Sequence, residues 1–315
     1  MSEDISYTAE EISKLLKISK LTVYDLIKKG ELPSYRVGKQ MRVDASDLNA
    51  YKLKSKGVPP QAQSEHPAPA VTSATSVNHG IRPLVITGQD ISLDILAKHL
   101  EKHAAGVRPL RSHVGSLDSL ISMYSGQSDI VSTHLLDGDT GEYNLPYIRK
   151  LFVGSSYMVV NLLARSAGLV VAQGNPHNIK GWADLSRSQL RIVNRERGSG
   201  ARVLLDEQLR LHGIKPNQLH GYDHVLTNHL SVAAKVASGE ADIGVGIEKA
   251  VSIVGNVEFL PLIQESYDLV VIKKPDNQSW IRSLMAVLHS EDFIQELTAI
   301  AGYDLSRTGQ ILYET

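Results

Sequence analysis

The sequence has 315 residues, of which 42% are hydrophobic and 21% are charged, and it contains no cysteine. These values are typical of a globular chain with two domains or one large domain, and they exclude disulfides, cysteine nucleophiles and thiolate metal sites. No stretch approaches the roughly 20 apolar residues of a membrane span, and the polar N-terminus lacks the apolar core of a signal peptide. We therefore expect a cytoplasmic location.

The formal net charge of −1 is unevenly distributed along the chain. Residues 1–57 hold 11 Lys and Arg against 8 Asp and Glu, a net charge of +3, whereas residues 81–315 hold 22 against 25, a net charge of −3. A mildly basic N-terminal segment followed by a mildly acidic remainder favours a DNA-binding domain attached to a second domain. The difference is small and needs support from the predicted elements.

The N-terminal segment predicts two short helices. Thr8, followed three residues later by Glu11, is typical of a capping box in front of the amphipathic run AEEISKLL. Ser19 is the predicted N-cap of the second helix, and Gly30 ends it. Two short helices at this spacing indicate a helix-turn-helix.

Two short strands, SYRV and MRVD, follow and predict a hairpin that acts as a wing. A recognition helix places its N-terminal side chains in the major groove, while lysine and arginine neutralise phosphates. The predicted DNA-binding residues are Ser19, Lys20, Thr22, Tyr24 and Lys28 in the second helix, and Arg36, Lys39, Gln40 and Arg42 in the hairpin. The alternative is that these are solvated charges on a protein-binding module.

The string YTAEEISKLLKISKLTVYDLIKKGELPSYRVGKQMRVDASDLNAY resembles the excisionase-like branch of the MerR-type winged helices. The resemblance covers residues 5–52. It implies double-stranded DNA as a partner. Because one winged helix has little affinity alone, a dimer on a two-part site is expected.

Residues 58–80 are rich in Pro, Ala, Ser and Thr and hold almost no large apolar side chain. Such a segment cannot bury enough surface to offset the entropy lost on ordering, so we predict a flexible linker. The predicted domains are therefore a DNA-binding winged helix-turn-helix at 1–57 and an effector domain at 81–315.

From Pro83 onward, predicted strands and helices alternate, beginning with the strand PLVITG and the helix ISLDILAKHLEKHAAG. This alternation is typical of an α/β fold with helices on both faces of mainly parallel sheets. In such sheets, ligands bind where loops leave the carboxyl ends of the strands, at helix N-termini.

The strings HLLDGDTGEYNLPYIRKL, NRERGSGARVLLD and ASGEADIGVGIE resemble a type II periplasmic-binding-protein domain. More narrowly, they resemble the effector half of a cytoplasmic regulator family related to molybdate-binding proteins, over nearly all of 83–315. The resemblance implies two lobes, hinge strands near 158–172 and 262–274, a cleft that closes on its ligand, and no catalysis. The effector domains of LysR-type regulators share this architecture, and by analogy a homodimer or homotetramer is expected.

The loops that would face the cleft supply the candidate ligand residues. Ser116 and Ser199 each open a predicted helix, where free backbone N–H groups and the helix dipole favour an anion, although an ordinary N-cap is the usual role of such a serine. The arginines of the turn RERGSGAR are either ligand contacts or surface charges. The predicted ligand-binding residues are Thr87, Gly88, Gln89, Ser116, Thr133, Arg195, Ser199, Gly200, Arg202 and Glu248.

The resemblance implies a ligand-responsive transcriptional regulator whose effector is a small anion, first of all molybdate or tungstate. Because the related molybdate sites use neutral donors, a cleft arginine would instead favour a small carboxylate or a phosphate-bearing metabolite. An enzyme with a DNA-binding head is a further alternative, but the acidic loop with Asp137 and Glu142 has no acid–base partner in the sequence. In a third alternative, the protein binds DNA and its large domain only assembles or recruits partners. No cofactor or metal is expected, and we interpret His134 and His229 as polar cleft or core residues.

Overall fold

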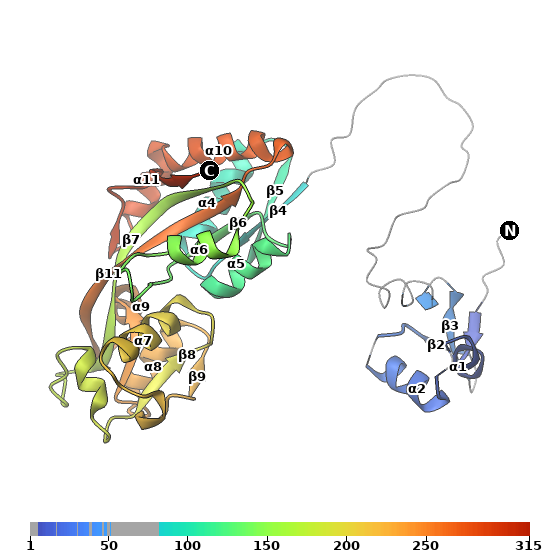
Figure 1. Cartoon of the computed structure of the whole chain (residues 1–315), viewed down its shortest axis with the longest axis horizontal. Coiled ribbons are helices and arrows are strands. Elements are labelled where there is room, and N and C mark those ends of the chain that lie inside the picture. Colours follow the sequence, from blue (N-terminus) through green and yellow to red (C-terminus); the bar gives the residue numbers. More distant parts are fainter. Residues whose placement is uncertain are drawn as a thin grey trace. The chain divides into compact units, whose positions relative to one another are not determined.

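The computed structural model describes residues 6–16, 18–29, 31–37, 40–45, 47, 48, 51 and 82–315. Contacts within the chain divide it into two compact units, residues 1–76 and 77–315, which are described separately (Figure 1). The predicted linker, residues 58–80, lies outside the described residues.

The N-terminal unit packs two helices on a small antiparallel sheet with the strand order β1-β3-β2. Its elements are β1 (Ser6–Thr8), α1 (Ala9–Leu16), α2 (Lys20–Lys28), β2 (Tyr35–Val37) and β3 (Gln40–Asp44). The buried core contains Ile12, Val23, Leu32, Val43 and Leu48. The predicted helices and hairpin are confirmed, whereas β1, only three residues long, was not predicted.

Both predicted helix starts of this unit are confirmed by their hydrogen bonds. Thr8 N–H donates to the Glu11 carboxylate at 2.8 Å, and Glu11 N–H donates to Thr8 Oγ1 at 3.4 Å. Thr22 N–H donates to Ser19 Oγ at 3.1 Å. These bonds satisfy backbone donors that the first turns of α1 and α2 leave without helical partners.

The second unit is built on one sheet in the order β5-β4-β6-β11-β7-β10-β8-β9, with β12 and β13 paired to β7. The strands are β4 (Arg82–Thr87), β5 (Val107–Ser112), β6 (Ile130–Thr133), β7 (Tyr157–Ala172), β8 (Ile192–Arg195), β9 (Val225–Leu226), β10 (Ile243–Ile247), β11 (Val257–Ile272), β12 (Tyr303–Asp304) and β13 (Ile311–Glu314). The helices are α4 (Ser92–His103), α5 (Ser116–Tyr124), α6 (Leu145–Leu151), α7 (Gly200–Leu211), α8 (His229–Ala237), α9 (Glu248–Ile253), α10 (Gln278–Leu288) and α11 (Glu291–Thr298), with short 3₁₀ turns η1 (Trp182–Ser186), η2 (Pro216–Gln218) and η3 (Pro275–Asn277).

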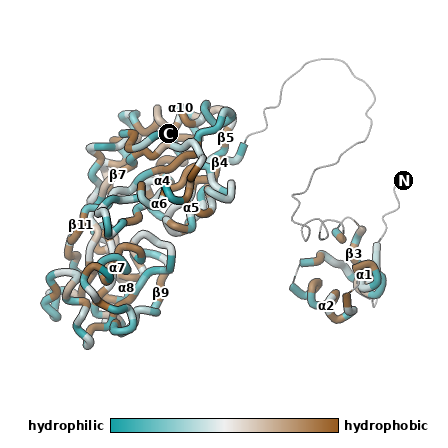
Figure 2. The backbone as a smooth tube through the Cα atoms, in the orientation of Figure 1, coloured by the Kyte–Doolittle hydropathy of each residue, from teal (hydrophilic) through white to brown (hydrophobic). Residues whose placement is uncertain are grey.

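This unit has two lobes joined by β7 and β11, which pair antiparallel along their full 16-residue lengths (Figure 1). Lobe one holds β4 to β6 with α4 to α6, α10 and α11, and lobe two holds β8 to β10 with α7 to α9. In lobe one, α4, α10 and α11 cover one core and α5 and α6 another, whereas lobe two has a single separate core. Figure 2 shows hydrophobic stretches inside the lobes and hydrophilic segments around their rims.

The predicted hinge ranges, 158–172 and 262–274, fall on β7 and β11 except for the last two residues. A Cβ placed on Gly168 of β7 would lie 2.0 Å from the Leu260 carbonyl oxygen. Close by, the register of β11 shifts between Pro261 and Ile263. Only glycine therefore fits at this position, where the strand pair enters lobe two.

Candidate ligand cleft and helix-turn-helix surface

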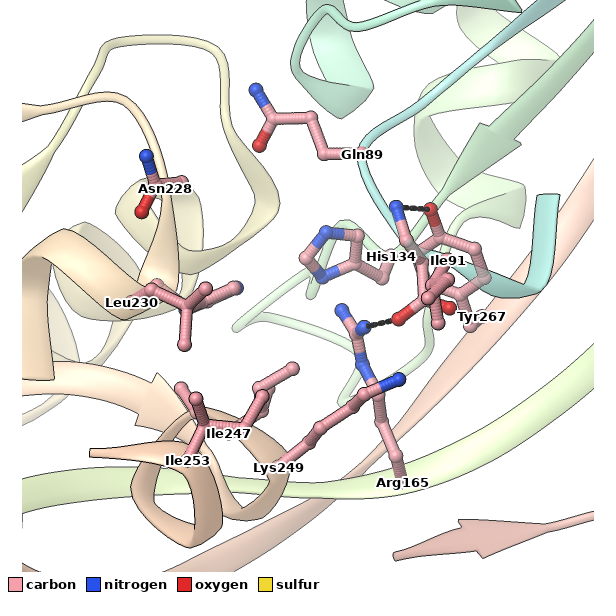
Figure 3. A pocket seen from close by; sticks show the side chains of 13 residues that line it. Gln89, Ile91, His134, Arg165, Asn228, Leu230, Ile247, Lys249, Ile253 and Tyr267 are labelled. Carbon is pink, nitrogen blue, oxygen red and sulfur yellow. Dashed lines mark hydrogen bonds and ion pairs between the residues drawn. The ribbon is translucent and has the colours of Figure 1, made fainter. Parts of the chain in front are cut away.

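Two adjoining cavities lie between the lobes. The larger, which we call the apolar cavity, has a volume of about 250 Å³ (Figure 3). The smaller, which we call the niche, has about 10 Å³, roughly the space of one water molecule. Gln89, His134 and Tyr267 line both of them. The two cavities are thus neighbouring compartments of one cleft.

The niche lies where helix starts from the two lobes meet. Gly115 is the N-cap of α5, and a Cβ on it would lie 2.9 Å from the carbonyl oxygen of Gly198, just ahead of α7. Leu117 N–H of α5 donates to that carbonyl at 2.8 Å. The lobes also touch at the acidic loop, where Gly138 N–H donates to the Glu207 carboxylate of α7 at 2.9 Å. The cleft is therefore closed on this side.

The two serines of the niche differ in what their hydroxyls do. Ser199, the N-cap of α7, accepts from Arg202 N–H at 3.2 Å and donates to the Glu196 carbonyl at 2.9 Å. Ser116, the first residue of α5, accepts from His134 N–H at 3.3 Å. Within the described part of the chain the Ser116 hydroxyl proton has no acceptor, so it can donate to a ligand.

Arg195 connects the niche to lobe one but brings little net charge. Its Nη2 donates to Gln89 Oε1 at 2.5 Å and to the Glu196 carboxylate at 2.7 Å. Burial works against the charge of Glu196, but hydrogen bonds from Arg195 and Gln89 and the Arg195 charge hold the pKa of Glu196 below its usual range. The guanidinium charge is thus compensated by a carboxylate of the protein.

The floor of the cleft is a buried group that we call the ionic cluster. It contains three charged side chains and one tyrosine hydroxyl: Asp90, Arg165, Glu265 and Tyr303. Arg165 of β7 and Glu265 of β11 are register partners, and Arg165 Nε donates to Glu265 at 2.5 Å. Arg165 also pairs with Asp90, which accepts from the Tyr303 hydroxyl. Burial opposes both carboxylate charges, but the Arg165 charge together with hydrogen bonds to Asp90 and with His134 beside Glu265 holds the pKa of both carboxylates below the usual range. All three charges are therefore retained and paired inside the protein.

Tyr267 and His134 cover this cluster on the cleft side. The Arg165 guanidinium lies 4.6 Å from the centre of the Tyr267 ring, and His134 Nδ1 lies 3.1 Å from Glu265 Oε2. Burial raises the pKa of Tyr267 to about 12, so its hydroxyl stays protonated near neutral pH. It lies 2.8 Å from Ser132 Oγ and extends the hydrogen-bonded floor.

Two further polar side chains, His229 and Lys249, line the apolar cavity, and Lys249 Nζ lies 5.3 Å from the centre of the Tyr303 ring. Burial, together with the charges of Arg195 and Arg165, holds the pKa of His229 well below 6.5, and its buried Nδ1 has no hydrogen-bond partner within the described residues. Burial lowers the pKa of Lys249, with Arg165 adding to the effect and Asp90 opposing it. Among the residues described, no carboxylate lies within ion-pair distance of Lys249. The neutral imidazole and the ammonium can both bind a ligand.

Apolar side chains form the rest of this cavity. Figure 3 shows Leu230 of lobe two across the cavity from Arg165 and Tyr267. Ile247 and Ile253, also of lobe two, lie on the same side as Leu230. Ile91, Leu230 and Ile253 are 46%, 44% and 62% exposed, which is high for such large apolar side chains. Their surface faces solvent at the mouth of the cleft.

The structure brings six of the ten predicted ligand residues together around the niche. They are Gly88, Gln89, Ser116, Arg195, Ser199 and Gly200. The other four line neither the niche nor the apolar cavity. Thr87 and Thr133 are buried at the ends of β4 and β6, Arg202 pairs with Asp206 and stacks on Tyr222, and Glu248 lies exposed beside Gly302.

Sequence reasoning placed Asp90 in a loop facing the cleft but did not single out Arg165, Glu265, Tyr267 or Lys249. A signal for two of them was present, because Arg165 and Glu265 interrupt strands that are otherwise mostly apolar. Charges in such strands are buried only when they are paired. His134 and His229 lie in the cleft as polar residues. The part of the chain that the structure describes contains no group of three or more His, Asp or Glu side chains suited to a metal ion.

The predicted DNA-binding side chains mostly lie on the exposed surface of the N-terminal unit. Ser19, Lys20, Thr22, Tyr24 and Lys28 of α2 are exposed, and Lys20 lies 3.5 Å from Glu10. On the hairpin, Arg36 is exposed and Arg42 donates to Ser6 Oγ at 3.1 Å. Lys39 and the side chain of Gln40 lie outside the described residues.

The fold and the cleft define a class of protein, a helix-turn-helix domain joined to a two-lobed domain of the periplasmic-binding-protein type. Residues 97–289 match the family model of the PBP superfamily domain, and residues 6–56 match that of the helix-turn-helix domain. The chain belongs to the PBP superfamily. It is 50% identical over 315 residues, all of both chains, to the uncharacterized protein YvgK of Bacillus subtilis (strain 168). The predicted two-domain fold class is confirmed.

Solved structures agree on the fold of the second unit. PhnD1 from Prochlorococcus marinus (MIT 9301) in complex with methylphosphonate is 15% identical, with a TM-score of 0.52, covering 72% of this chain and 95% of that one. A tungstate ABC transporter protein from Geobacter sulfurreducens is 14% identical, with a TM-score of 0.50, covering 70% and 99%. No helix in the described residues is both long and apolar enough to cross a membrane.

Proposed function

We propose that the protein is a ligand-responsive transcriptional regulator whose N-terminal unit binds double-stranded DNA and whose interlobe cleft binds a small anion. The observation that carries the proposal is the union, in one chain, of a helix-turn-helix with a closed cleft in which two helix starts from opposite lobes meet at a niche. The proposal includes a homodimer, which would place two helix-turn-helix units on a two-part DNA site. It also includes a cytoplasmic location.

The donors in the niche suit an oxyanion. Ser116, Ser199 and Gly200 at the starts of α5 and α7 line the niche, and both helix dipoles favour negative charge there. Because Glu196 compensates Arg195, these donors are close to neutral overall. Neutral donors agree with the resemblance to molybdate-binding proteins, so molybdate and tungstate stay the first inorganic candidates.

Entry of such an anion requires the lobes to shift. The niche has the space of about one water, and the Gly198 carbonyl occupies the Leu117 N–H that would face the anion. The anion therefore stabilises one placement of the lobes over another. A ligand that prefers one state in this way typically supplies about 1–3 kcal/mol of coupling to a second site, here DNA.

A regulator sensing a small carboxylate or a phosphate-bearing metabolite is the second candidate, and the apolar cavity with Lys249 favours it. An enzyme is not proposed. Both buried carboxylates of the cleft are engaged by Arg165, which keeps them charged and occupied rather than poised to move a proton.

The ligand half of the proposal is tested by thermal unfolding of the full chain with molybdate, tungstate, sulfate, phosphate, methylphosphonate and small carboxylates. At least one of these anions is expected to raise the unfolding temperature, and Ser116→Ala is expected to remove most of that increase. Ser188→Ala, an exposed serine of lobe two, is the matched control. An unchanged melting temperature and unchanged DNA affinity across the panel would overturn the proposal.

The DNA half is tested with a duplex selected from a random library. Lys28→Ala and Arg36→Ala are each expected to weaken binding and to reduce the slope of log affinity against log salt by about 1, as expected when one phosphate contact is lost. Lys215→Ala, an exposed lysine of the second unit, is expected to leave that slope unchanged. Equal affinity and slope for all three variants would argue against this surface.

A further inference from the structure

Most of the space between the lobes lies outside the niche. The niche has about 10 Å³, whereas the apolar cavity beside it has about 250 Å³ and shares Gln89, His134 and Tyr267 with it as lining residues. The lobes touch at the niche and close that side of the cleft. The apolar cavity nevertheless remains open. A ligand built only for the niche would leave this compartment without a function.

The walls of the larger compartment have the character of a site for an organic molecule. Leu230, Ile247 and Ile253 come from lobe two, and Ile91 faces them from lobe one. Ligand pockets for organic molecules are lined mainly by apolar side chains with a few placed polar groups. A bare tetrahedral oxyanion, surrounded by oxygens, has no surface that gains from contact with these four side chains.

Two polar side chains, His229 and Lys249, line the same space. The His229 Nδ1 atom is buried and has no hydrogen-bond partner in the described part of the chain. Lys249 makes no ion pair with the described carboxylates. Lys249 is half-buried and its Nζ lies 5.3 Å from the centre of the Tyr303 ring, so its ammonium keeps hydrogen-bond donors for an occupant with polar substituents.

We propose that the natural ligand is an organic phosphate or phosphonate. Its oxyanion group occupies the niche between the starts of α5 and α7 once the lobes have shifted to admit it, and its carbon body lies in the apolar cavity against Leu230, Ile247 and Ile253. Lys249 and His229 bind a polar substituent of that body. This inference rests on the proposed function and goes beyond it, because it assigns the class of the effector.

The inference is tested with a series of ligands that share one head. Inorganic phosphate, methylphosphonate, propylphosphonate, butylphosphonate and phenylphosphonate are titrated into the full chain by calorimetry. Since about 0.8 kcal/mol accompanies each buried methylene, affinity is expected to rise about fourfold per added carbon, with an increasingly negative heat-capacity change. Butyrate and molybdate serve as carboxylate and inorganic comparisons.

Variants locate the carbon body. Leu230→Ala and Ile253→Ala, at partly exposed positions that tolerate truncation, are each expected to reduce the ratio of butylphosphonate to phosphate affinity several-fold. Leu211→Ala, at a half-exposed leucine of α7 outside both cavities, is the matched control and is expected to leave that ratio unchanged. An equal reduction in all three variants would overturn the placement.

The possible outcomes separate this inference from the proposed function. A flat series, or molybdate or butyrate binding more tightly than every phosphonate, overturns the organic phosphate class. The proposed function then still stands if that anion changes DNA affinity. Absence of binding by all members, with DNA affinity unchanged, overturns both. A rising series whose longest member changes DNA affinity most supports both.

Discussion

The ionic cluster at β7 and β11 and the niche beside β8 each contain an arginine paired with a carboxylate, yet the two arginines have different partners. Arg165 is tied to Glu265 on the neighbouring strand and to Asp90 of lobe one. Arg195 belongs to lobe two and reaches across to Gln89 of lobe one. The first set of contacts can persist when the lobes separate, whereas the second must break. The cluster therefore supports the fold, and the niche supports the closed state.

The largest expected effect comes from breaking the cluster. Arg165→Leu leaves two buried carboxylates without a counter-charge, which typically destabilises a protein by about 3–5 kcal/mol. The free energy of unfolding of this domain, from denaturant titration, should fall by that amount. Lys235→Ala, which breaks an exposed pair with Glu240, should change it by less than about 1 kcal/mol. Similar values for the two variants would show that the cluster does not support the fold.

A second test uses His229, which faces the arginines of both regions. Its pKa in the folded protein lies below that of the unfolded chain, near 6.5. As pH falls below 6.5, the unfolded state takes up a proton that the folded state does not, so stability should decrease by up to about 1.4 kcal/mol per pH unit until the folded pKa is reached.

The measurement is the free energy of unfolding between pH 7.5 and pH 5.5. His229→Gln, which cannot titrate, should flatten this dependence, while the same change at the exposed His113 should preserve it. A wild-type slope in His229→Gln would contradict the assignment of a neutral imidazole between the two arginines.

A smaller effect distinguishes structural from ligand-binding hydroxyls in the niche. Ser199→Ala removes the N-cap of α7 and should destabilise the domain by about 1 kcal/mol, whereas Ser199→Asp keeps a capping oxygen and should restore most of that stability. The aspartate adds a negative charge to the niche, so it should still abolish anion binding. Recovery of anion binding by Ser199→Asp would place the anion elsewhere.

The smallest expected change in stability belongs to Gln89, the lobe-one partner of Arg195. Gln89→Ala should alter the free energy of unfolding by no more than about 0.5 kcal/mol, because the side chain is largely exposed. It should nevertheless separate the lobes, measured as a longer distance between fluorescent labels at the exposed positions Tyr124 and Leu211. An unchanged distance would mean that this contact does not hold the cleft closed.

Features set by neighbouring residues were predictable from the sequence. Both caps of the N-terminal unit, the hairpin, the alternation of strands and helices and the glycine–serine turns of the niche follow from spacings of a few residues. The pair of Arg202 with Asp206, four residues later on one helix face, was open to the same reasoning and explains why Arg202 is not in the cleft.

The ionic cluster was not predictable in this way, because its partners are distant in sequence. Arg165 lies 75 positions from Asp90 and 100 from Glu265, and only the pairing of β7 with β11 brings them together. The sequence also did not reveal which side chain at the start of α9 faces the cavity. Glu248 was predicted to face the ligand, yet its neighbour Lys249 lines the apolar cavity, since a one-residue step on a helix rotates the side chain by about 100°.

Gly168 and the irregular register of β11 beside it divide the two shared strands into unequal halves. All members of the ionic cluster lie on the lobe-one side of this point, and β10 pairs with β7 mainly beyond it. A rotation of lobe two would then pivot on a stretch of backbone that holds no ion pair. Lobe two would then turn relative to lobe one without breaking the ionic cluster.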